Sequence, residues 1–196
     1  MQTAIETLDM IRDVSRKYDR DPDHSLKVTN FSLDIFDDLY FLHYYGKAER
    51  RLLEMAGIMH DIGYSQRDPR PHNKLSRDLI LGMYIPGLNE TEKTICALVA
   101  RYHTGELPDA NEHRHFASLS NNRQEVVEWL SAILRVADAF DCKHADVVRK
   151  LTTEVTDKQI TFLLDAEGDC RRQIKRAHEK EDLLVKKSGR IIKYRC

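Results

Sequence analysis

An adjacent histidine and aspartate, His60 and Asp61, form the clearest chemical feature of this sequence. They stand where an apolar helical run, residues 52–59, gives way to Gly63. Neighbouring side chains on a helix diverge by about 100°. The two side chains therefore converge on one point only if a small, strongly coordinating group lies between them. A metal ion is the natural candidate, although a structural pair at a helix end is an equal alternative for this dipeptide alone.

Two distant residues favour the metal-binding alternative. Asp21 and Pro22 predict a helix N-cap and first helical position, and an apolar stripe that follows places His24 on the inward face of that helix. Asp138 lies beside the apolar face of the helical run 123–141. A buried carboxylate without a partner costs several kcal/mol. We therefore expect His24 and Asp138 to share a cation with the histidine–aspartate pair.

Two more histidines lie at the ends of predicted helices and complete a set of candidate metal ligands. His103 ends one helical run and His72 opens another. A histidine at a helix end can also cap carbonyl groups, and this alternative stays open for His103. The candidate ligands are His24, His60, Asp61, His72, His103 and Asp138. The remaining histidines, His43, His113, His115, His144 and His178, lie in polar or loop surroundings and are predicted to be solvated.

Imidazole nitrogens and carboxylate oxygens suit a divalent ion that keeps open positions for water. Such an ion lowers the pKa of its bound water and polarises a phosphoryl oxygen. One or two ions could bind, with Asp61 as the bridge between two, and Mn, Mg, Fe, Ni, Co and Zn are all candidates. Lys27, one turn after His24, and Arg101, close to His103, are the basic residues expected to contact a phosphate group, with Asp61 as the central catalytic residue. Weaker candidates of the same kind are Lys74, Arg77, Arg67 and Arg70.

The elements that must position these residues are mostly helices. Apolar residues recur every three to four positions in the runs 3–18, 23–44, 47–60, 73–81, 89–103 and 123–141. The polar stretch 109–122 is predicted to be an exposed loop. A hairpin over 152–165, a helix over 170–180 and a strand over 190–194 follow. We therefore expect an all-α helical bundle over residues 1–150 and a small α+β module over 151–196.

Bulk composition excludes several classes of protein. The 31 basic and 32 acidic residues nearly cancel, so there is no strong signal for nucleic acid, and no apolar run approaches the roughly 20 residues of a membrane span. The N-terminal residues lack the features of a secretory signal. The cysteines, Cys96, Cys142, Cys170 and Cys196, show no CxxC spacing and are predicted to be reduced packing residues of a cytoplasmic protein. The expected partner is a small phosphorylated substrate, and a homodimer is left open.

The order His24, His60-Asp61, Asp138 resembles the metal-binding signature of the His-Asp (HD) phosphohydrolase superfamily. Segments 18–39, 52–63, 79–103 and 130–141 are similar to the C-terminal HD region of the exopolyphosphatase and guanosine-pentaphosphatase (Ppx/GppA) family, and the tail from residue 160 is similar to its small terminal module. Those phosphatases act on polyphosphate through an actin-like N-terminal half with glycine-rich loops, which this sequence lacks. The resemblance therefore does not extend to exopolyphosphatase activity.

Three functional classes follow from the residues and the resemblance. The leading one is a divalent-metal-dependent phosphohydrolase that acts on a phosphate ester, a nucleotide or a polyphosphate-like small molecule through a metal-activated water. The alternative is a non-catalytic regulatory or binding module for a nucleotide, polyphosphate or protein partner. The third is a metal-dependent oxygenase, because some relatives of this fold use a mixed-valence di-iron site.

Overall fold

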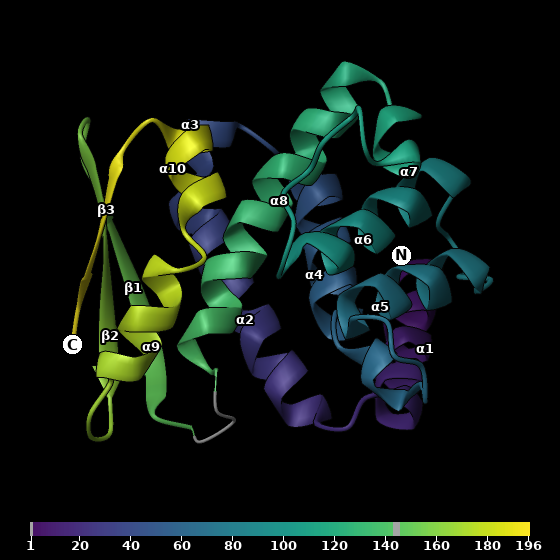
Figure 1. The fold of residues 1–196 in the computed structure, drawn as a ribbon, viewed down its shortest axis with the longest axis horizontal. Helices are drawn as coiled ribbons and strands as arrows, with labels where there is room; N and C mark the ends of the chain where they lie inside the picture. Colours follow the sequence, from purple (N-terminus) through teal and green to yellow (C-terminus); the bar gives the residue numbers. More distant parts are fainter. Residues whose placement is uncertain (1, 143–145) are drawn as a thin grey trace.

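The computed structural model describes residues 2–142 and 146–196, with side chains described from residue 7 onwards. His144, predicted to be solvated, lies outside these residues. The chain forms a mostly helical body followed by a small sheet with two short helices (Figure 1). The helical elements of the body are α1 (Gln2–Tyr18), α2 (Pro22–Asp38), α3 (Tyr40–His43), α4 (Lys47–Met59), the 3-10 helix η1 (Ile62–Ser65), α5 (His72–Gly82), α6 (Glu90–Tyr102), α7 (Arg114–Ala117) and α8 (Asn121–Phe140).

The predicted helix starts are confirmed by their capping hydrogen bonds. The Asp21 side chain accepts a hydrogen bond of 3.1 Å from the backbone N–H of His24, and Pro22 follows the cap. Asn89 and Glu92 cap α6 reciprocally, each side chain accepting from the other's backbone N–H. These bonds satisfy amide groups that the first helical turn leaves without partners. They fix the start of α2, which carries His24, and of α6, which His103 follows.

Two predictions about the body were wrong. The run expected to be one helix over 23–44 breaks after Asp38, and α3 ends at His43, before Tyr44, whose φ of 56° is left-handed. The stretch expected to be an exposed loop over 109–122 contains α7, and Phe116 is buried there against the Tyr102 ring, 6.0 Å away. The few apolar residues of this segment do not recur at helical spacing, so the sequence could not show this contact.

Helix α8 is the centre of the body. It lies against α2, α4 and α6 (Figure 1). Most of its residues from Val126 to Phe140 are buried. A helix that is apolar on most of its surface must have neighbours on every side. Helix α8 therefore carries Asp138 into the interior, within reach of residues on the surrounding helices.

The C-terminal part pairs three strands and packs them on the body. Strand β1 (Val148–Val155) is antiparallel to β2 (Gln159–Ala166), and β2 is parallel to β3 (Ile191–Arg195). Helices α9 (Arg171–His178) and α10 (Asp182–Ser188) connect β2 to β3 and lie against α8. The Phe162 ring lies 5.6 Å from that of Phe140, so sheet and body share one hydrophobic core. The predicted boundary at residues 150 and 151 falls within β1.

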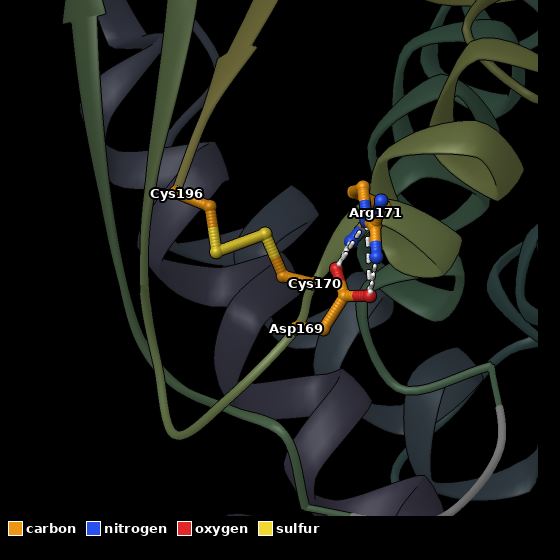
Figure 2. The surroundings of a disulfide bond; sticks show 4 residues. All are labelled: Asp169, Cys170, Arg171 and Cys196. Carbon is orange, nitrogen blue, oxygen red and sulfur yellow. Dashed lines mark hydrogen bonds and ion pairs between the residues drawn. A yellow bond between two sulfur atoms is a disulfide. The ribbon is translucent and has the colours of Figure 1, made fainter.

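The cysteines divide into two classes. Cys170, before α9, and Cys196, after β3, form a disulfide with Cα atoms 6.5 Å apart, so the prediction that both are reduced was wrong (Figure 2). They are 26 residues apart and meet only because β3 pairs beside β2. Cys96 is a buried free thiol, as predicted, and Cys142 is free and half-buried. Among the described helices, none is long and apolar enough to cross a membrane.

Candidate metal centre

The six candidate ligands lie together where the ends of several helices converge. His24 belongs to α2, His72 begins α5 and Asp138 belongs to α8, while the other three directly follow α4 or α6. Two groups have ligand atoms that all lie within 4.8 Å of one another: His24, His60 and Asp138, and His60, Asp61 and His103. His72 joins the second group, with Nε2 3.3 Å from Asp61 Oδ1 and 3.1 Å from His103 Nε2.

A glycine allows this convergence at the end of α4. Asp61 has left the helical conformation (φ −107°, ψ 4°), and η1 follows at once. A Cβ atom on Gly63 would lie 2.1 Å from the backbone oxygen of His72 and 2.6 Å from the Ser76 amide nitrogen. Only glycine permits this approach of α5 to the turn. The close approach brings the first residue of α5 against Asp61.

Three imidazoles are oriented by acceptors on their outer nitrogens. His60 Nδ1 donates to the Gly57 carbonyl at 2.7 Å, and His103 Nδ1 donates to the Ala100 carbonyl at 2.6 Å. His24 Nδ1 lies 2.8 Å from Asp141 Oδ2. Because carbonyl and carboxylate oxygens can only accept, each Nδ1 carries the proton and each Nε2 turns toward the cluster. This is the arrangement by which proteins orient metal-binding histidines.

The polar atoms of the cluster fit a cation. In the part of the chain that the structure describes, His60 Nε2 and Asp61 Oδ1 are buried and have no hydrogen-bond partner. A buried polar atom without a partner costs about 1–3 kcal/mol. A divalent ion among these nitrogens and oxygens would satisfy both atoms, so the residues present fit such an ion.

The buried carboxylates of the cluster shift the pKa values of its members so that positive charge is favoured near them. Burial disfavours the charged form of His24, yet Asp138 and Asp141 outweigh it and raise its pKa to about 10. Burial disfavours the charged forms of Asp61 and Asp138 too, but neighbouring positive groups hold the pKa of both carboxyls below their usual range. Burial and the repulsion of His60 lower the pKa of His103 to about 3. Two buried carboxylates thus remain charged beside the protonated ring of His24 and the neutral ring of His103.

A cavity of about 150 Å³ opens onto the candidate ligands. Besides five of the ligands, it is lined by Tyr64, Thr104, Cys142, Arg176 and Lys180. The Tyr64 ring stacks on His72, with centroids 4.0 Å apart. Arg176 and Lys180 come from the C-terminal part of the chain, 38 and 42 residues beyond Asp138. The basic side of the cavity is therefore supplied by a segment far from the ligands in sequence.

The basic residues selected from the sequence lie elsewhere. Lys27 Nζ donates to Asp141 at 3.1 Å and to Asp146 at 2.5 Å. Arg101 donates to Glu106 at 3.0 Å and lines a separate cavity of about 500 Å³. Of the weaker candidates, Lys74 contacts Glu106, Arg77 contacts Asp78, and Arg70 contacts Asp68 and Asp78. The structure brings the six candidate ligands together but does not bring Lys27 or Arg101 to the cavity beside them.

Sequence reasoning missed Asp141, which orients His24, and Lys180, which reaches Asp138. Asp141 follows Asp138 by three residues, within the predicted helical run 123–141, and this spacing could have revealed it. Lys180 gives no such signal. His43, predicted to be solvated, was placed wrongly: it is buried, donates from Nε2 to the Phe36 carbonyl and accepts from the Tyr45 amide at Nδ1.

Comparison with known families agrees with this architecture. A family model described as Ppx/GppA phosphatase, domain III, matches residues 8–183. The match includes all six candidate ligands and reaches α10. The resemblance to the C-terminal region of Ppx/GppA proteins is thereby confirmed. Because the matched residues make up most of the chain, this protein belongs to the Ppx/GppA phosphatase domain III family.

Proposed function

We propose that this protein is a divalent-metal-dependent phosphohydrolase of the HD type, acting on a phosphate ester, a nucleotide or a polyphosphate-like small molecule. The observation that carries the proposal is the convergence of four imidazoles and two carboxylates, five of them lining one cavity and His60 buried behind it, in the chain order His24, His60-Asp61, Asp138. The family match supports a phosphatase context. One or two ions could be held, with Asp61 shared between the two groups of ligands.

The residues of the site have distinct roles in this proposal. His60 and His103 offer Nε2, because their Nδ1 protons are engaged by carbonyls. Asp61 and Asp138 supply negative charge, and His24 is oriented by Asp141. When bound, a divalent ion supplies Lewis acidity toward a phosphoryl oxygen and a water of lowered pKa. The cavity of about 150 Å³, with Tyr64 at its wall, would have room for a phosphoryl group of the substrate.

Hydrolysis of p-nitrophenyl phosphate, followed by a panel of phosphorylated metabolites, tests the proposal. We expect turnover that depends on one of Mn²⁺, Mg²⁺, Co²⁺, Ni²⁺, Fe²⁺ or Zn²⁺ and is lost in Asp61→Ala. Asp165→Ala, at an exposed carboxylate of β2 away from the cavity, is the control and should retain full activity. A protein that binds these ions but hydrolyses none of the compounds would contradict a hydrolytic role.

A specific observation also favours the non-catalytic alternative. The matching family model describes one domain of a phosphatase rather than the whole enzyme. Under this alternative, the cluster would bind a phosphorylated ligand without cleaving it. Calorimetric binding of a nucleotide or of polyphosphate, with the ligand recovered intact after prolonged incubation, is the result expected of a binding module.

A further inference from the structure

A single lysine joins the C-terminal part of the chain to the candidate metal centre. Lys180 follows α9 and is 5% exposed, although lysine is among the residues that proteins bury least often. Its Nζ donates to Asp138 Oδ2 and, at 3.3 Å, to the backbone carbonyl of His103. An ammonium group has three donors. Among the described residues these two acceptors use two of them, and the side chain lines the cavity.

The position of Lys180 is fixed by a buried arginine. Arg135, on α8 and 3% exposed, donates from Nε to the Lys180 carbonyl at 3.4 Å. Its other nitrogens donate to the Tyr102 carbonyl at 3.0 Å and to the Asp182 carboxylate at 3.2 Å. Tyr102 directly precedes His103. One guanidinium thus ties the end of α6 to the segment between α9 and α10, which holds Lys180 at a defined place beside the ligands.

We propose that Lys180 is the phosphate-binding residue of this site, and that the C-terminal segment, through Lys180 with Arg176 beside it, completes the substrate pocket. This inference rests on the proposed function, because it assigns the substrate side of that centre. It replaces Lys27 and Arg101, whose side chains are engaged by acidic residues outside the cavity. The segment carrying α9 and α10 is then part of the active site.

The charges at the site explain why the Lys180 ammonium group would leave Asp138 and bind a phosphate. Lys180 now contacts Asp138, which also faces His24 through its other oxygen. Once Asp138 binds a divalent ion, its negative charge is largely compensated, and its attraction for Lys180 weakens. A phosphate held at the ion brings new negative oxygens to the same place, and charge-assisted hydrogen bonds to them are strong. Arg176, 44% exposed at its side chain and paired with Glu179, offers a second cation at the rim.

The test compares wild type with Lys180→Met, which keeps most of the length and removes the charge. Lys175→Met, at an exposed lysine on α9, is the matched control. Binding of Mn²⁺ is measured from the free-ion electron paramagnetic resonance signal, and binding of inorganic phosphate by calorimetry on Mn²⁺-loaded protein. We expect K180M to weaken phosphate binding by about tenfold to a hundredfold. Its Mn²⁺ affinity should be unchanged or higher, because a repelling cation has been removed.

Measuring phosphate binding and Mn²⁺ binding separately distinguishes a phosphate-binding role of Lys180 from a structural one. Loss of both Mn²⁺ and phosphate binding in K180M and also in Lys180→Arg would make Lys180 a structural residue and overturn the proposal. Equal phosphate affinity in wild type and K180M, or no phosphate binding in either, would overturn it as well. A wild-type chain that takes up no Mn²⁺ would instead contradict the proposed function. Because Lys180 would turn from Asp138 to a phosphate only with the ion in place, that result would overturn this inference as well.

Discussion

The Asp141 carboxylate binds the imidazole of His24 on the side away from the other candidate ligands, with Asp141 Oδ2 2.8 Å from His24 Nδ1. The pair joins the residue that follows α8 to the first turn of α2, and Lys27 contacts the second carboxylate oxygen at 3.1 Å. Asp141 therefore fixes both the direction of the imidazole and the nitrogen that carries its proton. A carboxylate in this position also makes the imidazole a better ligand.

We predict that Asp141→Asn weakens metal binding without removing a ligand. The amide lacks the negative charge, and it can present its N–H₂ group to Nδ1, which favours the wrong tautomer. The expected loss is about tenfold to a hundredfold in Mn²⁺ affinity, measured by titration of the free ion. Asp146→Asn, at an exposed carboxylate that also contacts Lys27, is the control and should bind Mn²⁺ like wild type. Equal affinities in all three proteins would show that Asp141 does not orient His24.

Metal removal should lower the thermal stability of the protein. The candidate ligands come from α2, α4, α5, α6 and α8 and their ends, so a shared ion would link these helices in the folded state alone. At a free ion concentration of about 100 times Kd, such binding stabilises by about 2.7 kcal/mol. For a chain of this size that corresponds to a melting temperature higher by roughly 5–10 °C. Calorimetric scans before and after chelation measure this change in melting temperature. His24→Ala should reduce the difference in melting temperature between the metal-loaded and the chelated protein.

Gly63→Ala should destabilise the chain and disturb His72. The added Cβ would lie 2.1 Å from the His72 carbonyl oxygen, so α5 must move away from η1. Overpacking of this kind costs about 1–3 kcal/mol. Denaturant unfolding measures the cost. Gly82→Ala, where nothing lies within 4 Å of the added Cβ, should be neutral or stabilising. A G63A protein as stable as wild type would contradict the close approach.

Acid should destabilise the folded state through His43. Burial against Phe36 and Tyr45 lowers the pKa of His43 below its usual value of 6.5, although Asp37 and Glu49 oppose this. The neutral ring is bound in the folded chain, whereas the unfolded chain takes up a proton below about pH 6.5. This contribution is therefore complete above pH 6.5 and is lost as the pH falls toward the folded-state pKa.

The comparison of wild type with His43→Gln isolates this effect. The free energy of unfolding of wild type should fall relative to the variant below pH 6.5, by at most about 1.4 kcal/mol per pH unit. Other histidines, His24 included, contribute equally to both proteins and cancel. His178→Gln, at a side chain 53% exposed, should leave the wild-type slope unchanged. Parallel curves for wild type and His43→Gln would exclude His43 as the titrating group.

Local sequence signals were sufficient for most of the helices and strands. Capping at Asp21 and Asn89 and the alternation around the β1–β2 turn depend on residues close in the chain, so they are readable without a fold. The break after Asp38 and the burial of Phe116 depend on how the elements pack, so local patterns did not predict them.

The amino-acid sequence alone determined which residues can form the candidate centre, because inward helical faces and the residues around Gly63 are local properties. Tertiary structure decided the surroundings of that centre. Lys180 reaches Asp138 only because α9 packs on α8, and Cys170 meets Cys196 only because β3 pairs beside β2. Lys27 and Arg101 form ion pairs with Asp141 and Glu106 and therefore do not line the cavity beside the ligands. Such contacts depend on how helices and strands pack against one another. The spacing of residues within one helix or strand does not predict that packing.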